Sequence, residues 1–98
     1  MNNKFHFTLY NKTTGEITEQ DRWDHSFGEF IADRMEYGDL EPEDIKAIER
    51  TVGDDTYRVE TDQEILDVLE EACEILEWRT MHMSNCYHAL NKYLRIHA

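Results

Sequence analysis

The sequence predicts a single α+β domain, residues 1–98, in which a small antiparallel β-sheet packs against helices. We expect the sheet to consist of an N-terminal hairpin plus a third strand. Three observations predict this fold: apolar residues alternate near the N-terminus, two helical patterns follow a capping motif, and an apolar stripe runs through the last third. The chain is 40% hydrophobic and 11% aromatic, which favours a folded domain over a disordered one.

The N-terminal segment has the two-residue period of a β-strand. Its apolar residues, Phe5, Phe7 and Leu9, alternate with polar or amphipathic ones. Residues 11–15 resemble a hairpin loop, since Gly15 can adopt a positive φ. We expect residues 16–23 to form the returning strand, with Ile17 as its apolar anchor.

A helix is predicted from Phe27 to Tyr37. Ser26 and Glu29 have the spacing of a capping box, in which each side chain bonds to the backbone of the other residue. Apolar residues then recur at helical spacing. Gly38 is suited to end the helix in a left-handed conformation.

Residues 42–52 fit two structures. Pro42 at a first helical position, followed by acids, favours a short helix Pro42–Arg50. Alternatively, residues 46–52 are extended and residues 52–56 form a hairpin turn, which would give two successive ββα units. In both cases Tyr57–Val59 is a strand, and we expect it to pair with the N-terminal hairpin.

The stretch 61–97 contains no Gly or Pro and begins with a second capping box, Thr61 to Glu64. Its stripe alternates in steps of four and three residues and consists of Ile65, Leu69, Ala72, Leu76, Arg79, Met83, Cys86, Leu90, Tyr93 and His97. Such a stripe predicts either a long C-terminal helix or a helical hairpin. An unbroken helix would be about 50 Å long, more than this domain can cover. Either it breaks near residues 80–84, as Arg79 and Ser84 favour, or its last half packs on a second copy.

Charge is the most unusual property of the chain. There are 22 acids and 10 Lys and Arg, a net charge of -12, and every acid lies between Glu16 and Glu77. This distribution argues against direct binding to nucleic acid, whose phosphates require cations. It favours a basic protein partner.

The acids form three groups that we take as candidate partner-binding residues. The first is a stripe opposite the apolar one, and it ends at an aromatic residue expected to be exposed: Glu64, Asp67, Glu70, Glu71, Glu74, Glu77 and Trp78. The others are Glu36, Asp39, Glu41, Glu43 and Asp44, and then Asp54 and Asp55. The stripe contains six like-charge pairs at i,i+3 or i,i+4. They cost about 1–3 kcal/mol in total, and the helix dipole compensates only the first turn.

No catalytic motif stands out, and we expect no enzymatic activity and no cofactor. His82, Cys86 and His88 are close enough in sequence to suggest zinc, but the usual ligand spacings are absent. Cys73 and Cys86 are expected to be free thiols. No signal peptide or membrane span is recognisable, which predicts a cytoplasmic protein, in a host cytoplasm if it is encoded by a virus.

These properties favour a small acidic inhibitor that blocks the nucleic-acid-binding site of a basic protein. A virus-encoded DNA mimic of the anti-CRISPR or anti-restriction type would have this size and charge. One alternative is an immunity or antitoxin protein that masks a basic toxin. Another is a small structural adaptor that forms a homodimer through the C-terminal helix, residues 83–97.

Overall fold

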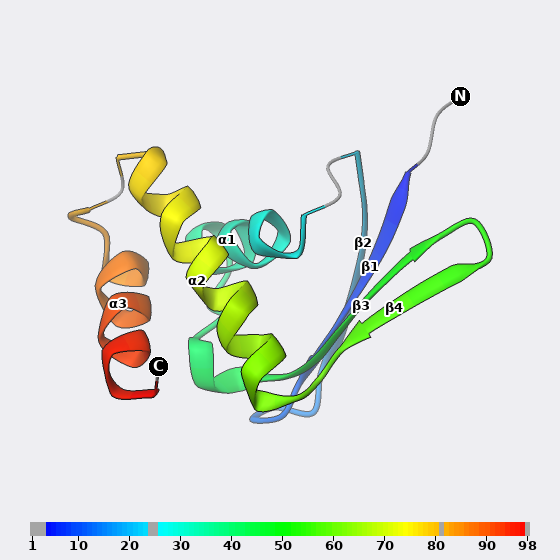
Figure 1. Cartoon of the computed structure of the whole chain (residues 1–98), viewed down its shortest axis with the longest axis horizontal. Helices are drawn as coiled ribbons and strands as arrows, with labels where there is room; N and C mark the ends of the chain where they lie inside the picture. The colour runs from blue at the N-terminus through cyan, green and yellow to red at the C-terminus, as the bar shows by residue number, and fades with distance from the viewer. Residues whose placement is uncertain (1–3, 24–25, 81, 98) are drawn as a thin grey trace.

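The computed structural model describes residues 4–23, 26–80 and 82–97. A four-stranded antiparallel sheet, in the order β2-β1-β3-β4, packs on helices (Figure 1). The elements in chain order are β1 (Phe5–Asn11), β2 (Ile17–Arg22), α1 (Phe27–Tyr37), the 3-10 turn η1 (Pro42–Asp44), β3 (Ile45–Val52), β4 (Asp55–Val59), α2 (Asp62–Trp78) and α3 (Asn85–His97). The predicted α+β class is therefore confirmed.

The N-terminal hairpin forms as predicted. Gly15 has a φ of 77°, and the Asn11 side chain accepts hydrogen bonds from the backbone of Thr13 and Thr14. Ile17, however, is not an apolar anchor, because its side chain is 57% exposed. It pairs with Tyr10 on the face of the sheet opposite the core, and β2 is an edge strand.

The preferred helix Pro42–Arg50 is wrong. Only the turn η1 is helical, and β3 follows it at once. Asp44, which is buried, accepts hydrogen bonds from the Glu41 backbone and the Thr13 hydroxyl. Four of the eight residues of β3 are β-branched, a signal that favoured the strand. The strand also completes the centre of the sheet, where Ile48 lies opposite Leu9 of β1.

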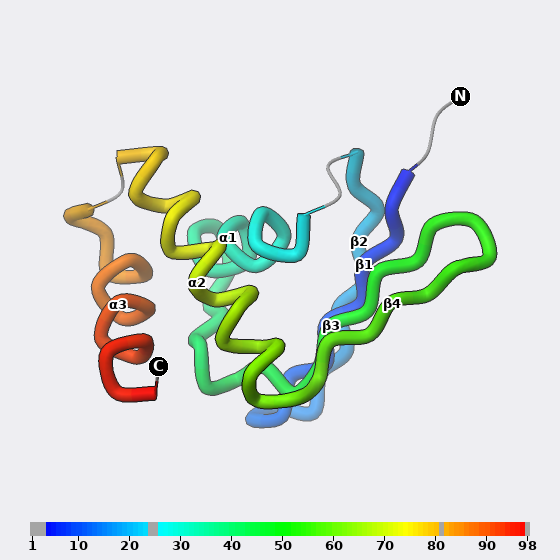
Figure 2. Tube along the Cα trace, in the orientation of Figure 1, coloured from blue at the N-terminus to red at the C-terminus, as the bar shows by residue number. Residues whose placement is uncertain are grey.

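The partner of the next strand also differs from the prediction. β4 pairs with β3 and not with the N-terminal hairpin. The chain therefore consists of two ββα units, β1-β2-α1 and β3-β4-α2, followed by α3, as the trace in Figure 2 shows. The two units meet where β1 pairs with β3 and where α1 packs on α2.

Both predicted helix starts are present. The Ser26 hydroxyl accepts from the Glu29 amide, and Thr61 and Glu64 form a complete capping box. The predicted left-handed end at Gly38 is wrong, since its φ and ψ are -120° and -174°. Its N–H still bonds to the Arg34 carbonyl, and the chain then leaves the helix in an extended conformation.

The long C-terminal stretch is broken where the sequence favoured a break. α2 ends at Trp78, Thr80 has a φ of 57°, and the Ser84 hydroxyl accepts from the Tyr87 amide at the start of α3. α3 then packs against α2 and buries Tyr87 and Leu90. The predicted helical hairpin is therefore present, and much of the wide apolar face of α3 is used within the chain.

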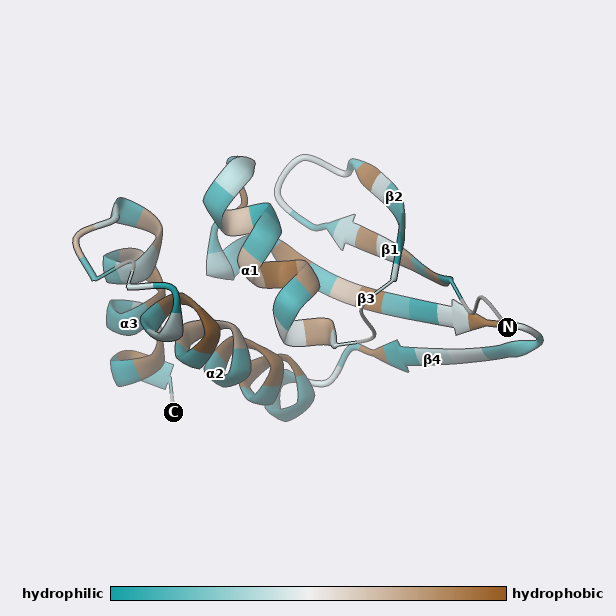
Figure 3. Cartoon of the chain, turned by 90° about the horizontal axis from the view of Figure 1, so that it is seen from above, coloured by the Kyte–Doolittle hydropathy of each residue, from teal (hydrophilic) through white to brown (hydrophobic). Residues whose placement is uncertain are grey.

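The core lies between one face of the sheet and the helices. It contains Phe7, Leu9, Ile48 and Val59 from the strands together with the inner side chains of α1 and α2. Hydropathy colouring in Figure 3 shows the hydrophobic residues gathered where the helices meet and the hydrophilic ones on the outer side of α2. None of the helices in the described ranges is long and apolar enough to cross a membrane.

Replacing Thr80 with Gly should stabilise the protein. A left-handed conformation costs a residue with a Cβ about 1–2 kcal/mol, and Gly does not bear this cost. The greater freedom of Gly in the unfolded chain offsets part of the resulting stabilisation. In urea unfolding, we expect the free energy of unfolding of the Thr80→Gly variant to exceed that of the Thr80→Ala variant by about 0.5–1 kcal/mol. An alanine variant as stable as the glycine variant would contradict the left-handed assignment.

Candidate partner-binding surface

An ion-pair network fixes the end of α2 to α1. Arg79 Nη1 lies 2.7 Å from Asp33 Oδ1 and 3.0 Å from Glu36 Oε1. Arg22 of β2 pairs with the same Asp33. The Glu36 side chain is only 14% exposed, so this candidate partner-binding residue has a partner within the fold.

Three of the six acids in the predicted α2 stripe also have internal contacts. Glu64 closes the capping box, where its hydrogen bond to the Thr61 backbone lowers its pKa. Glu71 Oε1 accepts from the Gly28 amide in the first turn of α1, at 2.9 Å. Glu77 Oε1 accepts from the Tyr87 hydroxyl, at 2.9 Å. The contacts of Glu71 and Glu77 account for two acids that lie beyond the first turn and that the helix dipole did not explain.

The remaining acids of the stripe point to solvent. Asp67, Glu70 and Glu74 are exposed, and Asp67 accepts a hydrogen bond from Gln63. Within the part of the chain that the structure describes, Glu70 and Glu74 have no hydrogen bond or ion pair. We call five exposed carboxylates of this helix the acidic face of α2: Asp67, Glu70, Glu71, Glu74 and Glu77. The helix contains seven acids and no Lys or Arg.

A groove borders the acidic face where α1 and α2 meet. Its volume is about 460 Å³, and its lining residues are Glu29, Glu71, Glu74, Ile75, Trp78 and Arg79. Trp78 is 89% exposed, so the predicted exposed aromatic is confirmed. The sequence did not single out Glu29, Ile75 or Arg79 as site residues. Ile75 and Arg79 neighbour Trp78 at helical spacing, whereas Glu29 reaches the groove only because α1 packs on α2.

The other two acidic groups lie elsewhere. Asp39, Glu41 and Glu43 are exposed beside α3, and a hydrogen bond that the protonated Glu41 carboxyl donates to Glu43 raises the pKa of Glu41. Glu43 shares a surface hollow with Lys92 of α3. Asp44 of this group is buried in η1.

Asp54 and Asp55 lie at the tip of the β3–β4 hairpin, which projects away from the helices (Figure 1). The fold therefore distributes the predicted partner-binding residues over three places and does not form one continuous acidic surface.

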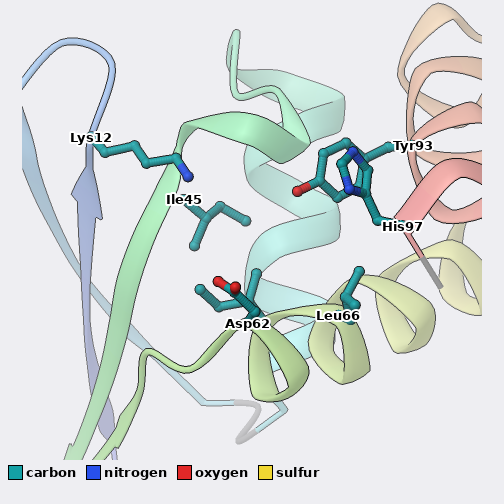
Figure 4. A pocket seen from close by; sticks show the side chains of 7 residues that line it. Lys12, Ile45, Asp62, Leu66, Tyr93 and His97 are labelled. Carbon is teal, nitrogen blue, oxygen red and sulfur yellow. The ribbon is translucent and has the colours of Figure 1, made fainter.

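A second cavity, of about 330 Å³, lies between the β1–β2 loop, β3 and the ends of α2 and α3 (Figure 4). Lys12 points into it from the loop, and Asp62 and Leu66 line it from α2. The rings of Tyr93 and His97 lie 4.1 Å apart at its far side. No sequence motif predicted this cavity, since its residues come from four separate segments.

The thiols and histidines that suggested chemistry have different surroundings. Cys73 is a buried free thiol whose pKa is raised by burial, and Cys86 is a partly buried free thiol. His82 packs edge-on against the ring of Tyr87. Across residues 4–23, 26–80 and 82–97, no group of three His, Cys, Asp or Glu is arranged to hold a metal ion.

His6 links the two strands of the N-terminal hairpin on the open face of the sheet. Its Nδ1 lies 2.6 Å from Asp21 Oδ1 and its Nε2 lies 2.8 Å from Glu19 Oε1. These hydrogen bonds, that of Asp21 first, raise the pKa of His6 above its usual 6.5. The protonated imidazole therefore binds both carboxylates in the folded state.

Stability should consequently depend on the charge of His6. Because the folded-state pKa exceeds the unfolded one, the contribution is complete below about pH 6.5 and is lost as the pH rises through the folded-state pKa. We expect the difference in unfolding free energy between the wild type and His6→Gln to shrink with rising pH. Urea titrations at several pH values measure it. A difference that stays constant or widens would contradict this assignment.

A comparison of the chain with protein-family models, with curated proteins and with solved structures finds no match.

Proposed function

We propose that this chain is a small acidic inhibitor that occupies the nucleic-acid-binding site of a basic protein or complex. The observation that carries the proposal is the acidic face of α2, which no Lys or Arg of that helix interrupts. Three arginines form ion pairs with acids outside the acidic face. Arg22 and Arg79 pair with Asp33, and Arg58 pairs with Glu49. The acidic face therefore keeps its negative field for a partner.

The charge spacing of α2 supports this proposal. The helix has 17 residues, which at 1.5 Å per residue gives a length of about 25 Å. Seven acids along it correspond to one negative charge per roughly 3.6 Å, close to the 3.4 Å per charge of a single nucleic-acid strand. The helix thus matches the linear charge density of one strand and about half that of a duplex. A cationic groove that follows a phosphate backbone is the surface it fits best.

The proposal predicts competition that depends on salt. The protein is mixed with candidate nucleases, restriction complexes and CRISPR effectors that carry fluorescently labelled DNA. We expect it to displace the DNA from its target, and its own affinity to fall steeply between about 50 and 200 mM salt. Binding that is indifferent to salt, or binding that leaves the DNA in place, would overturn the proposal.

A further inference from the structure

The groove between α1 and α2 combines three features that together fit one kind of side chain. Ile75 and the ring of Trp78 give it an apolar wall, and Glu71 and Glu74 give it a carboxylate rim. Trp78 ends α2 with 89% of its surface exposed, although burying a large aromatic would normally stabilise the protein by about 1.5–3 kcal/mol. Trp is one of the residue types enriched among the residues that contribute most to binding, and such residues cluster near the centre of an interface.

The charges of the groove favour a cation. Glu74 has no hydrogen bond or ion pair within the described chain, and Glu71 uses one oxygen, Oε1, for the Gly28 amide. Arg79 is the one cation among the lining residues, and its guanidinium is held by Asp33 and Glu36. The rim therefore presents more negative than positive charge to an incoming group.

We propose that this groove receives an arginine side chain from an arginine-rich segment of the partner. A guanidinium can stack on the indole face of Trp78 while its N–H groups donate to the planar carboxylates of the rim. Lysine supplies the charge without the planar surface, so arginine should bind more tightly. The inference rests on the proposed function, because nucleic-acid-binding sites are rich in arginine. The arginine side chain is the part of such a site that would enter the groove.

Trp78 can report this binding directly once the other tryptophan is replaced. In a Trp23→Phe background, fluorescence is recorded while an acetylated hexa-arginine peptide is added at low salt. We expect a saturable change with hexa-arginine, at least threefold weaker affinity for hexa-lysine, and no binding of the uncharged hexa-citrulline. Equal binding of all three peptides, or no change in the Trp78 signal, would overturn the inference.

Two variants with the same charge change separate the groove from general attraction. Glu74→Gln removes a charge from the rim, and Asp54→Asn removes one from the distant hairpin tip. We expect the first to weaken hexa-arginine binding by about 3–10-fold and the second by less than about twofold. Equal losses in both variants would show that the peptide is held by net charge alone and would overturn the groove assignment.

The peptide and DNA-competition experiments fail independently. A peptide that binds the groove while no nucleic-acid-binding protein is displaced overturns the proposed function and leaves the arginine site. The displacement of DNA by the Trp78→Leu and Glu74→Gln variants is measured by calorimetry or anisotropy. If both variants displace DNA as well as the wild type does, the arginine site is overturned and the proposed function remains.

Discussion

Replacing Asp67, Glu70 and Glu74 together with Asn, Gln and Gln is expected to raise the free energy of unfolding by about 1–3 kcal/mol at low salt. All six like-charge pairs of the α2 stripe include at least one of these residues. Among the residues that the structure describes, no other element donates a hydrogen bond to any of the three, so neutralising them removes repulsion without breaking a tertiary contact. Urea unfolding at low and high salt measures the gain, which should shrink as salt screens the charges.

The matched control neutralises the other three acids of the stripe. Glu64, Glu71 and Glu77 each accept a hydrogen bond that caps a helix or joins two elements. Changing these three residues to Gln removes as much charge as the first triple variant does, but it also weakens charge-assisted hydrogen bonds. We therefore expect a smaller increase in the free energy of unfolding, or a decrease. Equal stabilisation by the two triple variants would show that these contacts contribute nothing.

The stabilised variant should also be the inactive one. If the acidic face of α2 imitates a phosphate backbone, removing three of its charges should weaken the displacement of DNA from a target by at least about tenfold. A protein that keeps mutually repelling acids on one helix gives up stability for binding, a trade-off common at functional sites. A stabilised triple variant that still inhibits would place the contact surface elsewhere.

Leu90→Ala should cause a large loss of stability. Leu90 is fully buried where α3 packs on α2, and its truncation leaves a cavity there. Substitutions of this kind cost about 2–5 kcal/mol, a large part of the roughly 5–10 kcal/mol typical of a small domain. Thermal or urea unfolding followed by circular dichroism would show a strongly lowered midpoint.

Ile96→Ala is the control for this prediction. Ile96 belongs to the same helix but is 67% exposed, so its truncation should change stability by less than about 0.5 kcal/mol. If Leu90→Ala left stability unchanged and instead altered the sedimentation coefficient, α3 would be an assembly element and not part of the core. The homodimer predicted for this helix would then be the better explanation.

Features governed by neighbours in the sequence could be predicted from the sequence alone. The loop with Gly15, the cap at Ser26 and the capping box at Thr61 depend on hydrogen bonds that span three or four residues. The exposure of Trp78 followed from its position off the apolar stripe. The concentration of acids on α2 is a property of the sequence itself.

The tertiary structure decided what depends on distant partners. Residues 45–52 have apolar spacing compatible with a helix, but pairing with both β1 and β4 makes them a central strand, through which the second hairpin joins the first. Distant partners also decide the roles of the acids. Glu71 and Glu77 accept hydrogen bonds from α1 and α3, whereas Glu70 and Glu74 have no such donor among the described residues. Periodicity indicates which side of an element is buried. Which element covers that side, and which charge finds a partner, is fixed only by long-range packing.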